Sequence, residues 1–567
     1  MKSSVQLLLS LIGACTIGIH RCNAWAAIPQ SLTAVSSSTQ PKGKVVPSPS
    51  FHKDFRLHES TSEATTTISA ATTSAKKPSD TLHYNWKNQW YALTYANYIP
   101  NPSKSAEVTP ASVFGEPLVL WRSKDNGAVH CANDVCPHRS AALSEGRVRD
   151  GKLECYYHGW QYDGTKSGEC NSIPQLEKDA TIPKKACLKM RECRVVEGIV
   201  WAWMGDEAAT TDPPKQGDGL DEMDPITGKH KDYVINDFQI DLPYDHSYLV
   251  ENLIDPAHIP ISHDATSGGG KRENAQAYEM ILDGSSMSPT GFTGRYRTAT
   301  QREKDDPFIE VTYEAPGIIR QKGMPRGKDS PLRLGAALHC MPLTLGRSRL
   351  LFRVYFTGLP PLLMFLTTIK PKFLQDLNSC KILEQDAGLI TTQEDHFKRT
   401  KHSLKKDYIL LSSSDVFVKG YRQWLDKVGH GMPWYQGLAT RSSNVDDHLA
   451  NIPPSTPTLD PIQHRAGILE TRYHRHVMHC PTTRKALGRV TALKKIMAAL
   501  AVASITLSCG MTTSNHLLSH KVIRRMLKVL VPLIPLSSLA AAGLYKLEKS
   551  FFVSFKRKNQ MMQENGL

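Results

Sequence analysis

Apolar positions between residues 84 and 205 fall into short runs that are separated by turn-forming residues. The clearest runs are 90–99, 117–123, 128–134 and 195–205. Runs of this length, rich in β-branched and aromatic residues, predict strands of a small antiparallel domain, and the last run alternates as a closing strand does. The Pro- and Gly-rich stretch 210–219 then predicts a boundary between two domains.

Helical spacing of apolar residues occurs in the second half of the chain. Within 381–395 the apolar side chains recur at roughly helical intervals, at Ile382, Leu383, Ala387, Leu389 and Ile390. Two longer apolar runs, 496–511 and 529–545, contain 16 and 17 residues, at the short end of what spans a bilayer. Basic residues flank both runs, which is consistent with a membrane hairpin. The alternative is an interfacial or core hairpin, because Pro532 and Pro535 interrupt the second run.

The N-terminus has the layout of a secretory signal peptide, with Lys2, an apolar run over 5–19 and small residues up to Ala24. That run is too short to span a membrane as a helix. Residues 25–80 are rich in Ser, Thr and Ala and poor in acids, which is typical of a transit peptide. Together they resemble the bipartite presequence of algae whose plastids lie inside the endomembrane system, so we predict import into a plastid. The alternative is a plain secretory signal followed by a disordered linker.

Length and charge narrow the class of protein. A chain of 567 residues exceeds one ordinary core, so two or more domains with extensions are expected. The formal net charge is +15, but the basic residues concentrate in the N-terminal extension and the C-terminal tail. No basic stripe is interleaved with aromatic residues, so we predict no nucleic-acid binding. The twelve cysteines lack the spacing of a disulfide framework, which favours a reducing compartment.

Two short segments, CPHRS beginning at Cys136 and CYYHGW beginning at Cys155, each pair a cysteine with a histidine. The histidines are His138 and His158, and sixteen residues separate His138 from Cys155. This spacing predicts a Rieske [2Fe-2S] centre, in which two thiolates hold one iron and two imidazoles hold the other. Zinc is the alternative, because two Cys and two His also satisfy a tetrahedral site. Zinc-finger spacing, however, places the two cysteines together, whereas here Cys and His alternate.

A second set of metal-ligating residue types lies beyond the domain boundary. Asn252, Asp255 and His258 recur every three residues and therefore share one face of a predicted helix turn. Pro260 is expected to disturb that helix, so that His263 returns toward His258 from the following loop. Two histidines with one carboxylate form the facial triad of non-haem Fe(II), which leaves positions open for O2.

The third ligand has to come from a distant segment, and our candidate is Asp386 in the predicted helix 381–395. Three acids in the same stretch compete with it: Glu384, Glu394 and Asp395. Glu251 is excluded, because one step along a helix turns it about 100° away from Asn252. Taken alone, these residues would be ordinary histidines and solvated acids. An electron carrier upstream in the same chain implies a second centre to reduce, which favours the metal site.

The cluster segments followed by ENLIDPAHIPISH resemble the chlorophyll-related Rieske non-haem iron oxygenases, a family that includes pheophorbide a oxygenase, chlorophyllide a oxygenase and protochlorophyllide oxygenase. The resemblance covers most of the chain from Tyr84 onward. Within the family, ISHDATSGGGKRENAQ and RYHRHVMHC are most similar to the member associated with the chloroplast inner-envelope translocon.

The resemblance implies roles for individual residues. It implies that the [2Fe-2S] cluster is bound by Cys136, His138, Cys155 and His158. It implies that His258, His263 and Asp386 bind mononuclear Fe(II). Asp255 would carry electrons between the two centres, and we group Asn252 with it as a candidate catalytic residue.

We therefore expect an α+β protein with a plastid presequence and a membrane tail. The predicted parts are a signal peptide (1–24), a transit peptide or disordered linker (25–80), an antiparallel β Rieske domain (84–205), a helix-grip-like α+β catalytic domain (206–460), a basic connector (461–490), a two-helix membrane hairpin (491–548) and a basic tail (549–567).

The family implies a monooxygenase of chlorophyll catabolism in a plastid membrane, envelope or thylakoid. It would take electrons from ferredoxin or a similar donor, use O2 and hydroxylate a phyllobilin-like linear tetrapyrrole. It would act as a homotrimer in which the cluster of one subunit serves the iron of the next. The alternatives are an oxygenase of the pheophorbide or chlorophyllide macrocycle, and a redox sensor of the protein-import translocon that does not turn over.

One departure from the family lies near the C-terminus. The family has a CxxC pair there, proposed as a thioredoxin target, whereas this chain has Cys480 followed by Pro, Thr and Thr483. Without the second cysteine, regulation through an internal disulfide is in doubt. The same absence disfavours the redox sensor, which would be expected to use both thiols.

Overall fold

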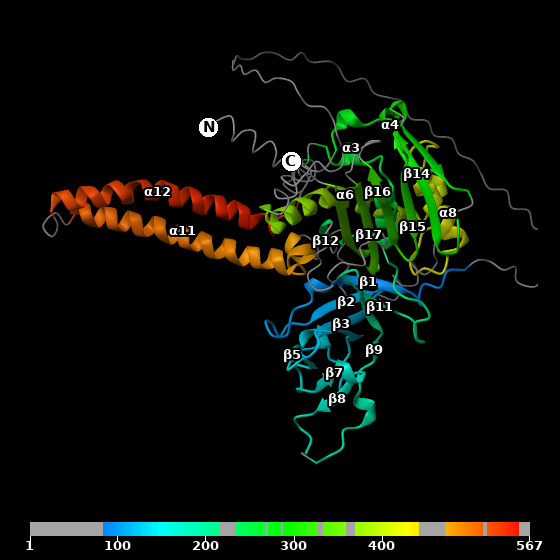
Figure 1. The fold of residues 1–567 in the computed structure, drawn as a ribbon, viewed down its shortest axis with the longest axis horizontal. Helices are drawn as coiled ribbons and strands as arrows, with labels where there is room; N and C mark the ends of the chain where they lie inside the picture. Colours follow the sequence, from blue (N-terminus) through cyan, green and yellow to red (C-terminus); the bar gives the residue numbers. More distant parts are fainter. Residues whose placement is uncertain are drawn as a thin grey trace, which may run out of the picture. The chain divides into compact units, whose positions relative to one another are not determined.

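The computed structural model of the 567-residue chain describes most of the sequence from residue 83 onward (Figure 1). The described residues are 83–177, 179–215, 233–264, 266, 270–284, 287–304, 306–325, 333–358, 369–440, 471–513 and 519–554. The predicted signal peptide (1–24) and transit peptide (25–80) lie outside them, as does most of the predicted basic tail.

The first domain consists of three small antiparallel sheets. The short apolar runs predicted an antiparallel β domain here, but not its division into sheets. The first sheet has the order β1-β11-β10, with β1 Trp90–Tyr95, β10 Cys193–Val196 and β11 Ile199–Trp203. The second has the order β2-β3-β4-β9, with β2 Thr109–Val113, β3 Glu116–Arg122, β4 Val129–Asn133 and β9 Met190–Arg191. The third has the order β5-β6-β7-β8, with β5 Arg147–Arg149, β6 Lys152–Glu154, β7 Gln161–Asp163 and β8 Glu169–Ser172.

The second domain is built on one antiparallel sheet of seven strands in the order β12-β18-β17-β16-β15-β14-β13. Its strands are β12 Val234–Leu242, β13 Tyr278–Leu282, β14 Gly291–Thr298, β15 Ile309–Glu314, β16 Ile318–Pro325, β17 Arg333–Thr344 and β18 Arg347–Thr357. Its helices are α2 His246–Ile254, α3 Ile259–Ser262, α4 Ala299–Glu303, α6 Lys372–Thr400, α7 Leu404–Asp407 and α8 Val416–Lys427. The predicted helix 381–395 therefore lies inside the longer α6.

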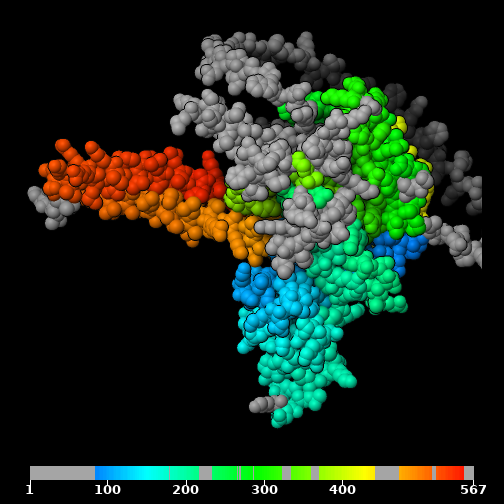
Figure 2. Space-filling view, viewed as in Figure 1, coloured from blue at the N-terminus to red at the C-terminus, as the bar shows by residue number. Residues whose placement is uncertain are grey.

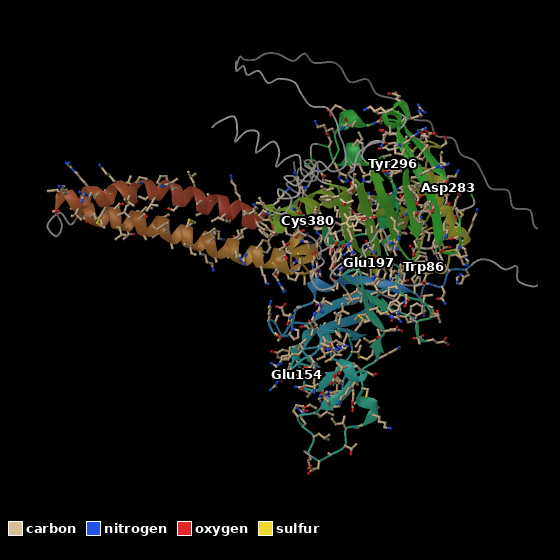
Figure 3. All side chains as sticks on the ribbon, viewed as in Figure 1. Trp86, Glu154, Glu197, Asp283, Tyr296 and Cys380 are labelled. Carbon is tan, nitrogen blue, oxygen red and sulfur yellow. The ribbon has the colours of Figure 1, made fainter. Side chains whose placement is uncertain are left out.

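The core of the second domain is a single hydrophobic cluster between the sheet and three helices, α2, α6 and α8. Cys380 of α6 and Tyr296 of β14 both belong to it, and Figure 3 labels them on these elements. Tyr84 and Trp86 also pack in this cluster, although they precede β1 of the first domain. Helices and antiparallel strands thus share one core, and the predicted α+β class is confirmed.

Buried charge joins the two domains. Arg349 of β18 forms a two-pronged ion pair with Asp241 of β12, with Nε–Oδ1 2.6 Å and Nη2–Oδ2 3.0 Å, and its Nη1 donates to the backbone oxygen of Leu93 in β1 at 3.1 Å. Arg353 of β18 makes a similar link between the domains. It pairs with Asp237 of β12 and donates to the backbone oxygen of Glu197, which lies between β10 and β11. Because a buried charge without its partners costs several kcal/mol, these contacts hold the domains in one arrangement.

Two long helices follow, α11 Pro481–Thr513 and α12 His520–Lys549, and they pack side by side (Figures 1 and 2). Their most apolar windows have mean hydropathies of 1.6 and 1.8, and both helices are long and apolar enough to cross a membrane. Pro532 and Pro535 lie inside α12 without ending it. Only 17% and 6% of the two windows are buried in the protein, as expected of helices whose apolar surface faces lipid rather than a core.

The start of α11 and the end of α12 are anchored to α6. Glu384, which the sequence left as a rival ligand, accepts hydrogen bonds from Arg472 and Arg475 just before α11, at 2.6–2.9 Å. Phe551, two residues after the end of α12, is fully buried and belongs to the same small hydrophobic cluster as Leu377 of α6. The hairpin of α11 and α12 is therefore attached to α6, the helix that carries Asp386.

Candidate metal centres

The two cluster segments form matching loops, one after β4 and the other between β6 and β7. In the first loop the Cys136 amide donates to the Ala141 oxygen at 2.9 Å, and in the second the Cys155 amide donates to the Trp160 oxygen at 2.9 Å. Each loop closes through a residue with positive φ, Ser140 in one and Gly159 in the other. Each therefore projects its cysteine and its histidine from a tight turn.

The cysteines and the histidines of these loops differ in how deeply they are buried. The cysteines are buried at 2% exposure each, whereas His138 is exposed and His158 half-buried. The imidazole centroids lie 4.6 Å apart, and the His138 ring stacks on Trp160 at 4.4 Å and 8°. Burial raises the pKa of the Cys155 thiol. The thiols lie on the inner side and the imidazoles on the outer side. This separation fits a cluster in which two thiolates hold one iron and two imidazoles hold the other.

A single zinc ion fits this arrangement less well. Zinc needs all four donor atoms around one point. Among the described residues, the groups of three or more His, Cys and acid side chains whose donors come within 4.8 Å of one another lie elsewhere in the chain. The assignment of Cys136, His138, Cys155 and His158 as cluster ligands stays a prediction that this geometry supports.

The second constellation does converge. Donor atoms of His258, His263 and Asp386 all lie within 4.8 Å of one another. His263 Nε2 is 3.2 Å and His258 Nε2 is 3.6 Å from the same oxygen, Asp386 Oδ2. Separations of this size are those of ligands that share one ion at bond lengths of about 2 Å. Two imidazoles and a carboxylate on one side fit a facial Fe(II) site, which stays a prediction as to the metal.

The backbone around the histidines differs from the predicted continuous helix. α2 ends at Ile254, and Asp255 is its extended C-cap residue. Pro256 explains this end, because proline disfavours helical backbone in the residue before it. Pro260 does not break a helix but lies in the first turn of the short α3, where its missing N–H costs nothing. α3 therefore separates His258 from His263, and their ring centroids lie 5.3 Å apart.

The electrostatics of the triad are those of a carboxylate facing imidazoles. Burial opposes charge on Asp386, but hydrogen bonds from His258 and His263 outweigh burial and hold its pKa well below the usual range. Burial likewise opposes the His258 imidazolium, yet Asp255 and Asp386 raise its pKa to about 10. The pocket thus provides strong compensation for a positive charge.

Neighbouring polar groups orient the three side chains. Asp255 Oδ2 lies 3.5 Å from His258 Nδ1, and Asn252 Nδ2 lies 3.5 Å from Asp386 Oδ2. Both predicted catalytic residues therefore lie at the site, and their roles stay predictions. Sequence reasoning missed two others: Ser262, whose hydroxyl donates to Asp386 Oδ1, and Gln385, whose Oε1 lies 3.1 Å from His263 Nδ1. Ser262 precedes His263 and Gln385 precedes Asp386 in the sequence. This adjacency was the one signal that could have identified them.

Glu251 and Glu394 pair with side chains outside the triad, although Glu251 also lines the cavity beside it. Glu251 accepts from Arg422 Nε at 2.6 Å and from the Tyr408 hydroxyl at 2.9 Å, and Glu394 pairs with Lys398 at 2.8 Å. A cavity of about 360 Å³ opens beside the triad. It is lined by side chains from α2, α6, α8 and the 407–410 segment, among them Asn252, Asp255, His258, Ile390, Tyr408 and Leu410. A substrate in this cavity would lie against His258.

Comparisons with known proteins agree with this organisation. The family model described as Rieske [2Fe-2S] domain matches residues 89–189. The model described as Pheophorbide a oxygenase matches residues 313–403, which include Asp386. His258 and His263 lie between the two matched regions.

The chain is also similar to curated plant proteins over most of its length. It is 34% identical over 444 residues to "Protein TIC 55, chloroplastic" of Arabidopsis thaliana, which covers 76% of this chain and 78% of that protein. The protein of the same name from Pisum sativum is 35% identical over 440 residues, 75% of each chain. Pheophorbide a oxygenase of Oryza sativa is 26% identical over 444 residues, 74% of this chain and 76% of that protein.

Proposed function

This chain belongs to the family of Rieske non-haem iron oxygenases that contains TIC 55 and pheophorbide a oxygenase, and on that premise we propose that it hydroxylates a chlorophyll-derived tetrapyrrole in a plastid membrane. The observation that carries the proposal is the meeting of His258, His263 and Asp386 beside an open cavity, in a chain that also has the cluster loops. A protein that used the cluster only as a sensor would have no need for the triad.

The residues have distinct tasks in this proposal. When bound, the cluster would supply single electrons, and the mononuclear iron would activate O2 for oxidation of a substrate C–H bond. Cys136, Cys155, His138 and His158 would hold the cluster. His258, His263 and Asp386 would hold the iron on one side, while Ser262 and Gln385 keep Asp386 and His263 in their orientations.

We infer that the substrate is a linear tetrapyrrole of the phyllobilin kind. The similarity to the two TIC 55 proteins, 34% and 35%, exceeds that to pheophorbide a oxygenase, 26%, and it is the translocon-associated member whose hydroxylation of phyllobilins the resemblance implies. Oxidation of an intact pheophorbide or chlorophyllide macrocycle is the second candidate, favoured by the pheophorbide a oxygenase model that matches 313–403.

The test uses the full-length chain in detergent with ferredoxin, its reductase and ¹⁸O2. Separate reactions contain a phyllobilin, pheophorbide a or chlorophyllide a, and mass spectrometry follows ¹⁸O in the product. We expect one labelled oxygen in the phyllobilin. Label in a macrocycle alone would replace the first candidate by the second, and no label in any pigment, with both iron centres loaded, would overturn the oxygenase proposal.

We also propose a homotrimer with a ferredoxin-like donor, attached to a plastid envelope or thylakoid membrane through α11 and α12. Exposure of His138 supports transfer between subunits, because an exposed residue is accessible to another chain. The chloroplastic names of the relatives support the compartment. Asp255 would then lie between the cluster loops of one subunit and His258 of the next.

Asp255→Asn tests this bridging role. The substitution removes the carboxylate that faces His258 Nδ1 but leaves all proposed iron ligands. We expect unchanged iron content and normal cluster reduction, with product formation slowed about 10- to 100-fold, as for other groups that support a metal ligand. Stopped-flow measurement of cluster reoxidation in a single turnover checks it. Asp264→Asn, at an exposed acid nearby, is the control, and equal rates in the two variants would contradict the role.

A further inference from the structure

A second compact group of metal-ligating side chains lies away from the triad. Donor atoms of Asp376, His476 and Cys480 are all within 4.8 Å of one another, and each side chain is at most 1% exposed. Asp376 lies near the start of α6, His476 in the π-helical turn η7 (Tyr473–Val477), and Cys480 directly before α11. Thr483, fully buried, completes the group.

The distances within this group fit one ion. Asp376 Oδ2 is 3.8 Å from His476 Nε2, 3.8 Å from Cys480 Sγ and 2.8 Å from Thr483 Oγ1. Thr483 Oγ1 is in turn 3.3 Å from both Cys480 Sγ and His476 Nε2. In a tetrahedral zinc site with ordinary bond lengths, neighbouring donor atoms are about 3.4 to 3.6 Å apart. Shifts of a few tenths of an ångström would therefore bring all four to a common ion.

The orientation of His476 is that of a metal ligand. Its Nδ1 lies 2.6 Å from the backbone oxygen of Gln239 in β12, and because a carbonyl only accepts, Nδ1 carries a proton and donates it. Nε2 then faces Asp376 and Thr483. Histidines that bind metals usually donate their second ring N–H to a carbonyl or carboxylate in this way.

We propose that Asp376, His476, Cys480 and Thr483 bind a structural zinc ion. A thiolate, an imidazole and a carboxylate are the donors that zinc takes in proteins, and a site closed by protein ligands on all sides is the structural kind. His476, Cys480 and Thr483 follow one another at intervals of four and three residues, so they lie on one side of the turn. The thiolate would supply negative charge to the ion, and Asp376 would share its carboxylate between the ion, through Oδ2, and the Lys372 ammonium, through Oδ1.

The position of the proposed zinc site indicates a structural role for the ion. α6 carries both Asp376 and, ten residues later, the triad residue Asp386. Cys480 immediately precedes α11, the first of the two helices predicted to enter the membrane. Cys480 also packs in the hydrophobic cluster of the first domain with Tyr98. The ion would therefore tie α6, the first domain and the membrane hairpin together at one point, independently of which pigment is oxidised.

Metal analysis of the full-length protein in detergent tests the zinc site. We expect one zinc per chain besides the iron, lost in Cys480→Ser and in His476→Gln with the iron retained. His258→Ala should lose mononuclear iron and keep zinc. Cys509→Ser, at an exposed cysteine of α11, is the matched control and should keep both metals. With Co(II) in place of zinc, a thiolate-to-cobalt absorption band should appear and vanish in Cys480→Ser.

A second variant keeps the proposal testable if those proteins fail to fold. Thr483→Cys replaces a weak hydroxyl donor by a thiolate, so it should slow zinc loss to a chelator by about tenfold or more. Wild-type protein with no metal beyond its iron would overturn the proposal and leave a proton shared by His476 and its neighbours. Zinc that persists in both Cys480→Ser and His476→Gln, or is lost equally fast from Thr483→Cys, would overturn it too.

Discussion

Asp386→Ala is expected to remove the mononuclear iron and to lower turnover by more than about 100-fold, because losing a ligand exceeds the 10- to 100-fold effects of supporting residues. Among the described residues, Asp386 is the carboxylate that both histidines face, at 3.2 and 3.6 Å. The cluster should remain, since its loops belong to the other domain. Iron analysis together with the electron paramagnetic resonance signal of the reduced cluster measures both centres in one sample.

Asp395→Asn is the matched control for this prediction. Asp395 is also a buried acid of α6, nine residues beyond Asp386, and was a rival ligand on sequence grounds. We expect this variant to keep its mononuclear iron. If Asp395→Asn lost iron while Asp386→Ala retained it, the triad would be assigned to the wrong carboxylate.

Cys155→Ser is expected to abolish the cluster and with it all turnover. Cys155 is 2% exposed, and its loop is held by the hydrogen bond to the Trp160 oxygen. A serine hydroxyl does not replace the thiolate that a Rieske iron requires. Because cofactor binding contributes to folding, the variant should also unfold at a lower temperature. Visible absorption and thermal unfolding of the detergent-solubilised chain check the two effects.

Cys170→Ser separates ligand loss from loss of a buried thiol. Cys170 lies in the same hydrophobic cluster as Cys136 and Cys155 and is 3% exposed, so its substitution removes similar packing. We expect an intact absorption spectrum. Equal loss of the spectrum in both variants would mean that packing, and not ligation, explains the result for Cys155.

Thr483 connects the family resemblance with the zinc site. Its hydroxyl is 3.3 Å from Cys480 Sγ, so a cysteine at position 483 would face Cys480. In this chain position 483 is a threonine, and among the described residues Cys480 is a free thiol. Regulation through a disulfide at this position is therefore not expected, and Cys480 is available to bind the proposed zinc ion instead.

The sequence alone determined the local features of the chain. Cys136, His138, Cys155 and His158 are a few residues apart within each loop, so their spacing carries the chemistry. Short apolar runs identified β1, β3, β4 and β11 of the first domain, and long ones identified α11 and α12, because strand and helix periodicity are properties of neighbouring residues. The run 195–205 is a hairpin rather than one strand, since Glu197 and Gly198 turn the chain between β10 and β11.

Only the tertiary structure decided what depends on distant segments. It brought Asp386 to His258 and His263 across more than a hundred residues and turned Glu384 toward Arg472 instead, although both acids lie on one helix. It ended α2 at Ile254, and it joined Asp376 to His476 and Cys480. Periodicity places a side chain on one face of its own helix, whereas the partner that meets this face is set by how the helix packs on the sheet.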